Sequence, residues 1–125
     1  MSGLTRDAVK FIRDGAKSRY NKGSECEICG STENLDFHHY YSLAQLLDRW
    51  CTKNGITLNT DEEVLAIRER FIAEHEYELF EATVTLCHYH HHNCLHKIYA
   101  KSPGLGTAKK QMNWVRIQKE KHGVV

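Results

Sequence analysis

Cysteine and histidine are concentrated at two places in this chain, at spacings typical of metal ligands. Cys26 and Cys29 are separated by two residues in a glycine-flanked turn, and two thiolates at this spacing can bind one tetrahedral ion. Cys87 precedes His90 by three residues and His91 by four. A Cys-x-x-Cys pair also serves redox chemistry. The second pair, placed beyond a predicted strand, instead favours a structural Zn²⁺ site of Cys26, Cys29, Cys87 and either His90 or His91.

The remaining cysteines are interpreted as thiols. The chain has 5 cysteines, an odd number, and its first residues do not have the pattern of a signal peptide. Cys51 follows Trp50 in a predicted helix and is expected in the core. Cys94 lies inside the second histidine cluster, where it would be either a core residue or a ligand.

Two histidine clusters suggest a second metal ion of a different kind. His38 and His39 end a predicted strand, where neighbouring side chains point to opposite faces. His92 and His96 are four residues apart, so on an α-helix their rings share one face. Three neutral imidazoles, from His38, His92 and His96, would leave coordination positions open for water and phosphate. Such an open site is typical of a catalytic divalent ion.

Hydrophobic periodicity and turn signals predict the elements that position these residues. The class is α+β: a short β-hairpin and a helix with further helices around them, in a single domain over 1–125. Helices are predicted over 4–18, 42–52, 61–78, from the second histidine cluster through Ala100, and over 107–121, with strands at 35–40 and 83–86. The two helices of 42–52 and 61–78 are expected to pack against the hairpin, away from DNA, through Leu43, Leu46, Trp50, Leu65 and Phe71.

Charge is segregated along the chain although the formal net charge is only +1. Basic residues dominate the N-terminal helical region 1–24 and the C-terminal helix 107–122, whereas the helical segment 40–82 is acidic. Two basic ends suit a polyanionic partner, and we expect double-stranded DNA. No run of 18 apolar residues is present, so no membrane span is predicted. A cytoplasmic location is expected, in the host cytoplasm if the chain is encoded by a phage.

The motifs resemble those of the HNH endonucleases, in particular small phage-encoded and free-standing homing-type members with a zinc knuckle. The resemblance covers about 26–100 and is interrupted by an insertion at about 40–82. It implies a ββα-metal fold, in which a hairpin and a helix surround one catalytic ion. The matching segments are Cys26-x-x-Cys29, Leu35-Asp36-Phe37-His38-His39, Val84-Thr85-Leu86-Cys87 with the histidines that follow, and Leu95-His96.

The resemblance also implies roles for single residues. His38 would bind the catalytic ion, His39 would be the general base, and the helix would supply the other ligands. The family spacing of its helix histidines falls on His91 and Leu95, with His96 one position late. Helix geometry favours His92 with His96, whereas motif spacing favours His91. We therefore predict His92 as the ligand, with His91 as the alternative.

The implied reaction is hydrolysis of DNA phosphodiester bonds with Mg²⁺, Mn²⁺, Ni²⁺ or Zn²⁺ as the catalytic ion. The sequence departs from the family at Ala82, where an asparagine usually orients the general base. This departure keeps open a weakly active or inactive zinc module that binds DNA or regulates another process. A nuclease acting on RNA is the other alternative.

Overall fold

The computed structural model describes residues 7–100 and 103–123, which form a helix-rich α+β structure with one antiparallel pair of strands. The predicted α+β class is confirmed. The elements are α1 (Ala8–Ala16), the 3₁₀ turn η1 (Lys17–Arg19), β1 (Leu35–His39), α2 (Leu43–Asn54), α3 (Asp61–Glu74), the π-helical turn η2 (Tyr77–Glu81), β2 (Thr83–Cys87), the π-helical segment η3 (Tyr89–Leu95), α4 (His96–Tyr99), the 3₁₀ turn η4 (Leu105–Thr107) and α5 (Ala108–Lys121).

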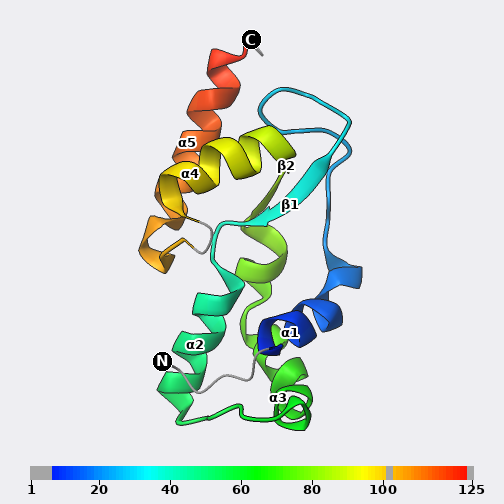
Figure 1. Cartoon of the computed structure of the whole chain (residues 1–125), viewed down its shortest axis with the longest axis vertical. Coiled ribbons are helices and arrows are strands. Elements are labelled where there is room, and N and C mark those ends of the chain that lie inside the picture. The colour runs from blue at the N-terminus through cyan, green and yellow to red at the C-terminus, as the bar shows by residue number, and fades with distance from the viewer. Residues whose placement is uncertain (1–6, 101–102, 124–125) are drawn as a thin grey trace.

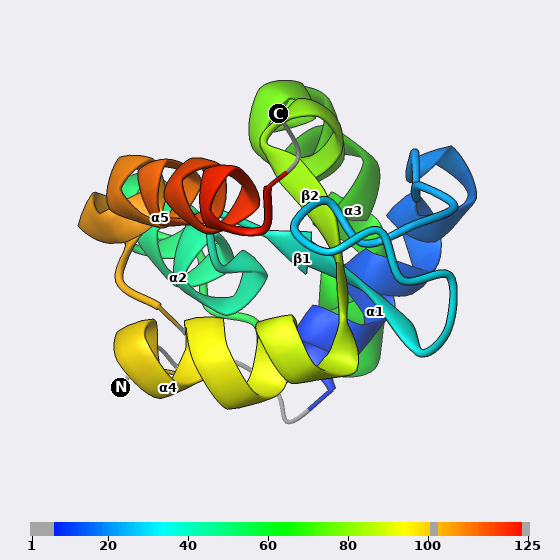
Figure 2. The same cartoon turned by 90° about the horizontal axis from the view of Figure 1, so that it is seen from above.

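The molecule has two parts, which Figure 1 shows one above the other. The upper part contains β1, β2, α4 and α5, and the lower part contains α1, α2 and α3. In the view from above, α4 and α5 run beside the two strands (Figure 2). The metal-ligand candidates all belong to the upper part or its loops, whereas the lower part is helical.

The strands place neighbouring histidines on opposite faces. β1 and β2 pair antiparallel along their full lengths, with His38 opposite Val84. The period of two puts Asp36 and His38 on one face and Phe37 and His39 on the other. The strands are not joined by a tight turn, because α2, α3 and η2 lie between them in the sequence.

Local capping explains where the two inserted helices begin and end. The Ser42 hydroxyl accepts from the Gln45 amide at the start of α2, and Gly55 ends that helix with a left-handed φ of 66°. Thr60 and Glu63 form a capping box at the start of α3. These signals are local, so the sequence predicts both starts closely.

The packing of the insertion differs from the prediction. Four of the five side chains expected against the hairpin lie in a core formed with α1 instead, and the fifth, Leu65, is 46% exposed. The buried positions of α3 include Val64 and Phe71, one heptad apart, which turns Leu65 to solvent. The expected five were Leu43, Leu46, Trp50, Leu65 and Phe71.

A second core fixes the loop that carries Cys26 and Cys29, here called the cysteine loop, against the strands and α5. Ile28 of the loop, Leu86 of β2 and Leu95 of η3 are each 0% exposed in this cluster. Burying side chains of this size contributes about 1.5–3 kcal/mol each. Loop, strand and π-helical segment are therefore held together by packing as well as by any bound ion.

Several helix boundaries differ from the predicted ones. The N-terminal helix is described from Ala8, and the predicted residues 4–6 lie outside the described part of the chain. The helix predicted over 61–78 ends at Glu74, and η2 follows it. Within residues 7–100 and 103–123, no helix is long and apolar enough to cross a membrane.

Candidate functional site

Three cysteines and a histidine converge where the cysteine loop meets the end of β2. The Cys29 and Cys87 sulfurs are 3.9 Å apart. The His90 Nδ1 atom lies 3.2 Å from the Cys87 sulfur and 3.8 Å from the Cys26 sulfur. Of the two histidines the sequence allowed here, the structure brings His90 to the cluster, while His91 points elsewhere.

These distances fit one tetrahedral ion. Ligands with bonds of about 2.3 Å to sulfur at tetrahedral angles lie about 3.8 Å apart. Gly30, with a left-handed φ of 76°, closes the turn by donating its amide to the Cys26 carbonyl. Burial lowers the pKa of His90, which favours the neutral ring that a metal requires. The cluster could therefore hold a metal ion.

Three imidazoles form a second cluster, between β1 and the start of α4. The His38 Nδ1 atom lies 3.0 Å from His91 Nε2, and His96 Nε2 lies 2.9 Å from the same nitrogen. His38 and His91 are buried and His96 is partly buried. This group also has the geometry to hold a metal ion.

The outer nitrogen of each ring faces a hydrogen-bond acceptor. His38 Nε2 donates to the Gln111 side-chain oxygen at 2.7 Å, and His91 Nδ1 donates to Asp36 at 3.2 Å. His96 Nδ1 donates to the Ala100 carbonyl at 2.6 Å. These acceptors fix the tautomers, so the nitrogens that face one another carry lone pairs and no protons.

Three lone pairs at such distances repel one another unless a cation lies between them. Ligands with bonds of about 2.1 Å at right angles are about 3.0 Å apart, which matches the spacing of the inner nitrogens. Burial lowers the pKa of His38 to about 3 and that of His91 to about 4. The His38 and His91 rings are therefore neutral at pH 7.

The Gln111 amide is oriented by its other contacts. Its nitrogen donates to the Tyr40 carbonyl at 3.1 Å and to the Thr107 hydroxyl at 3.0 Å, which leaves its oxygen for His38. Gln111 is 0% exposed and comes from α5. The sequence reasoning missed both Gln111 and Asp36. Asp36 had a detectable signal, since it lies two residues before His38 on the same strand face.

The structure selects His91 over His92 at this cluster, the reverse of the predicted order. The segment from Tyr89 to Leu95 is π-helical, with hydrogen bonds five residues apart instead of four. His91 and His96, five apart, therefore share a face, with ring centroids 4.4 Å apart. The inserted residue accounts for the late position of His96. His92 faces Asp36 and lies outside the three-histidine group.

His39 lies on the other face of β1 and belongs to neither metal cluster. Its Nε2 donates to the Leu79 carbonyl at 3.2 Å, which leaves Nδ1 with a lone pair. Its ring packs edge-on against Tyr20 and Phe37. Burial lowers the pKa of His39 to about 4, so the ring is neutral at pH 7.

The hydrogen-bond acceptor of His39 is thus a backbone carbonyl and not a side chain at position 82. Leu79 belongs to the π-helical turn η2, whose last hydrogen bond runs from the Ala82 amide to the Tyr77 carbonyl. The sequence gives no signal for this contact, because a main-chain carbonyl is present at every residue.

Two cavities meet at His39. One, of about 590 Å³, also contains Asp36, His91 and His92, and the other, of about 240 Å³, contains His38 and His96. Three residues line both: Arg13, Phe37 and His39. A ligand in these cavities would therefore lie against an arginine, the His39 ring and the three-histidine cluster.

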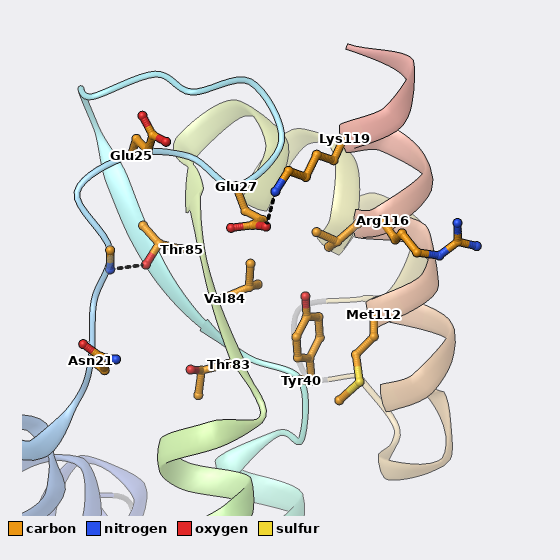
Figure 3. A pocket seen from close by; sticks show the side chains of 12 residues that line it. Asn21, Glu25, Glu27, Tyr40, Thr83, Val84, Thr85, Met112, Arg116 and Lys119 are labelled. Atoms are coloured by element: carbon orange, nitrogen blue, oxygen red, sulfur yellow. Dashed lines mark hydrogen bonds and ion pairs between the residues drawn. The ribbon is translucent and has the colours of Figure 1, made fainter. Parts of the chain in front are cut away.

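A third cavity, of about 540 Å³, lies between β2, the loop before Cys26 and α5 (Figure 3). Glu27 accepts from Lys119 across it at 2.8 Å, and Glu25 also lines it. No cysteine or histidine is among its described lining residues. Arg116 and Lys119 balance its two carboxylates, and it shares no lining residue with the two cavities at His39, so it is separate from the candidate site.

The two other cysteines are not in the clusters. Cys51 is 1% exposed in the helical core, as expected. Cys94 is partly exposed and lies outside every described group that could hold a metal ion.

No solved structure matches the chain. A family model described as the nicking endonuclease family matches residues 2–124, nearly the whole length. The chain therefore belongs to the phage T5 nicking endonuclease family, and this membership implies a nuclease that cleaves DNA.

Proposed function

We propose that the protein is a metal-dependent HNH endonuclease that hydrolyses phosphodiester bonds in one strand of double-stranded DNA. The observation that carries this proposal is the convergence of three imidazoles, with His91 Nε2 3.0 Å from His38 Nδ1 and 2.9 Å from His96 Nε2. The neutral His39 ring lines the same two cavities as members of this cluster. The strands β1 and β2 with the helical segment η3–α4 supply the order of elements of a ββα-metal fold.

The catalytic ion would bind His38, His91 and His96. When bound there, a divalent cation would polarise the scissile phosphate and stabilise charge on the leaving oxygen. Imidazole nitrogen suits Mn²⁺, Co²⁺, Ni²⁺ or Zn²⁺ better than Mg²⁺. Asp36 and Gln111 would hold two of the three ligand rings in the metal-binding tautomer.

His39 would act as the general base. Its Nδ1 accepts a proton from water, and the resulting hydroxide oxygen bonds to phosphorus as the bond to the 3′ oxygen breaks. The leaving 3′ oxygen takes a proton from solvent. The Leu79 carbonyl keeps the proton on Nε2, which leaves the lone pair on Nδ1.

The cysteine cluster would hold a structural Zn²⁺. Three thiolates and one imidazole form a closed tetrahedral set, and soft sulfur ligands favour zinc over hard cations. The ion would tie the cysteine loop to the end of β2. It would thereby fix η3, which begins two residues after Cys87 and carries His91.

The contacts at His39 argue against an inactive zinc module. That alternative rests on Ala82 leaving the general base without a partner. Because the Leu79 carbonyl supplies one, the site retains the hydrogen bond that the mechanism requires.

Supercoiled plasmid incubated with the protein and a divalent ion should be converted to the open-circular form. We expect Mn²⁺, Co²⁺ or Ni²⁺ to support the reaction best, because the ligands are imidazoles, and EDTA to stop it. Gel electrophoresis separates the supercoiled, nicked and linear forms. An unchanged plasmid with every ion would refute the proposed function, and immediate linearisation would refute single-strand cleavage. A matched RNA duplex tests the alternative substrate.

Arg13 should contribute to DNA binding, since it lines both cavities at His39. Replacing it by alanine removes one phosphate contact. We expect about tenfold weaker binding at low salt, with the slope of log K against log salt reduced by about 0.9. Lys10→Ala is a matched control, because Lys10 is exposed on the same helix and lines neither cavity. Equal salt slopes for Arg13→Ala and Lys10→Ala would contradict this role.

A further inference from the structure

A third group of metal-ligating side chains lies beside the three-histidine cluster. The Asp36 Oδ2 atom is 3.5 Å from His88 Nδ1 and 3.4 Å from His92 Nε2. We propose that these three side chains bind an additional divalent transition-metal ion, separate from the two ions proposed above. The inference concerns ion binding alone and does not depend on whether the protein cleaves DNA.

The distances fit coordination of a shared ion. Both exceed the range of about 2.7–3.2 Å for N–H···O bonds. Ligands with bonds of about 2.1 Å at tetrahedral angles lie about 3.4 Å apart. The three ligand atoms all lie within 4.8 Å of one another, so a single ion can reach all of them with small side-chain shifts.

The two imidazoles are already arranged for a shared ion. The His88 and His92 rings stack with centroids 4.4 Å apart and planes 22° apart. They are four positions apart in the sequence, and each presents a nitrogen to the same carboxylate oxygen. Two imidazoles and one carboxylate suit Zn²⁺, Co²⁺, Ni²⁺ or Cu²⁺ better than Mg²⁺ or Ca²⁺.

The site is open, in contrast to the buried cluster of His38 and His91. The side chains of His88 and His92 are 59% and 42% exposed, and that of Asp36 is 32% exposed. An ion there would keep water ligands and exchange readily. Binding should therefore be weaker than at the other two clusters, most of whose ligands are buried.

The position connects this site to the candidate cleavage cavity. Asp36 and His92 line the cavity of about 590 Å³ that also contains Arg13 and His39. Asp36 Oδ2 also accepts from His91 Nδ1. An ion on Asp36 would thus add positive charge beside a polyanion in that cavity, on the far side of the His91 ring from the proposed catalytic ion.

Equilibrium dialysis of the zinc-containing protein against Co²⁺ tests the proposal. The wild-type chain should bind one Co²⁺ more than His88→Ala or His92→Ala, at the weaker of two classes of site. Asn93→Ala is a matched control on the same segment, since Asn93 is exposed and lies in none of the ligand groups. His38→Ala should lose the other class of site and keep this one, which separates failure of this inference from failure of the catalytic site.

A measurement on the wild-type protein removes any dependence on how the variants fold. Paramagnetic Co²⁺ should shift or broaden the imidazole NMR signals of His88 and His92 at the weaker binding step. Unperturbed signals at these residues would overturn the proposal. The same conclusion would follow if wild-type protein, His88→Ala and His92→Ala bound equal numbers of Co²⁺ with equal affinities.

Discussion

His39→Ala should reduce plasmid nicking by a factor of about 10²–10⁴ while leaving the proposed catalytic and structural ions bound. The loss is large because a general base acts in the transition state. The metals are retained because His39 lies outside both ligand groups and on the opposite strand face from His38. The measurement is the initial nicking rate with saturating Mn²⁺, together with metal analysis and DNA affinity of the same preparation.

A second variant separates a chemical role of His39 from a structural one. His39 packs against Tyr20 and Phe37, so alanine also removes ring contacts. In His39→Gly, free imidazole can enter the vacated space and should restore part of the rate, which a purely structural role would not allow. Full activity in His39→Ala would exclude the proposed base, and loss of one ion with His39 would make it a ligand.

The convergence of the three cysteines could be predicted from the sequence because the residues occur in short, local pairs. Cys26 and Cys29 share one turn, and Cys87 and His90 lie within four residues at the end of a strand. Such spacings fix geometry almost independently of the rest of the fold. The sequence left the choice between His90 and His91 open, because it depends on how the chain turns after β2.

The choice of His91 over His92 in the histidine cluster could not be predicted from residue spacing alone. The predicted pair His92 and His96 assumes the hydrogen-bond spacing of an α-helix, whereas the segment is π-helical and pairs His91 with His96. The residue types do not predict a π-helical segment, because the extra residue of such a segment is stabilised by its tertiary contacts. The family motif indicated His91 because its spacing reflects the positions of the ligands themselves and does not assume an α-helical period.

The hydrogen-bond partners of His38 and His39 that are distant in the sequence could not be predicted either. Gln111 reaches His38 from 73 positions away, and the Leu79 carbonyl reaches His39 from 40 positions away. Strand alternation could have identified Asp36. A glutamine and a main-chain carbonyl carry no comparable pattern, so only the packing of α5 and η2 against β1 identifies them.

His91→Ala should abolish both nicking and binding of the catalytic ion. The His91 ring is central to the cluster, since its Nε2 lies within 3.0 Å of a nitrogen on each of the other two ligand rings. Removing it leaves two ligands and exposes them to water. We expect a loss of at least about 10³ in rate with Mn²⁺, comparable with the removal of a catalytic group.

The most direct test compares His91→Ala with His92→Ala in one assay of supercoiled plasmid, with the Mn²⁺ content of each protein measured in parallel. The proposed site predicts that His91→Ala loses nicking and the tightly bound Mn²⁺. His92→Ala should keep that ion and lose less than about tenfold in rate, because its ring faces Asp36 outside the three-histidine group. Loss of the ion and of nicking in His92→Ala, with both retained in His91→Ala, would contradict the proposed catalytic centre.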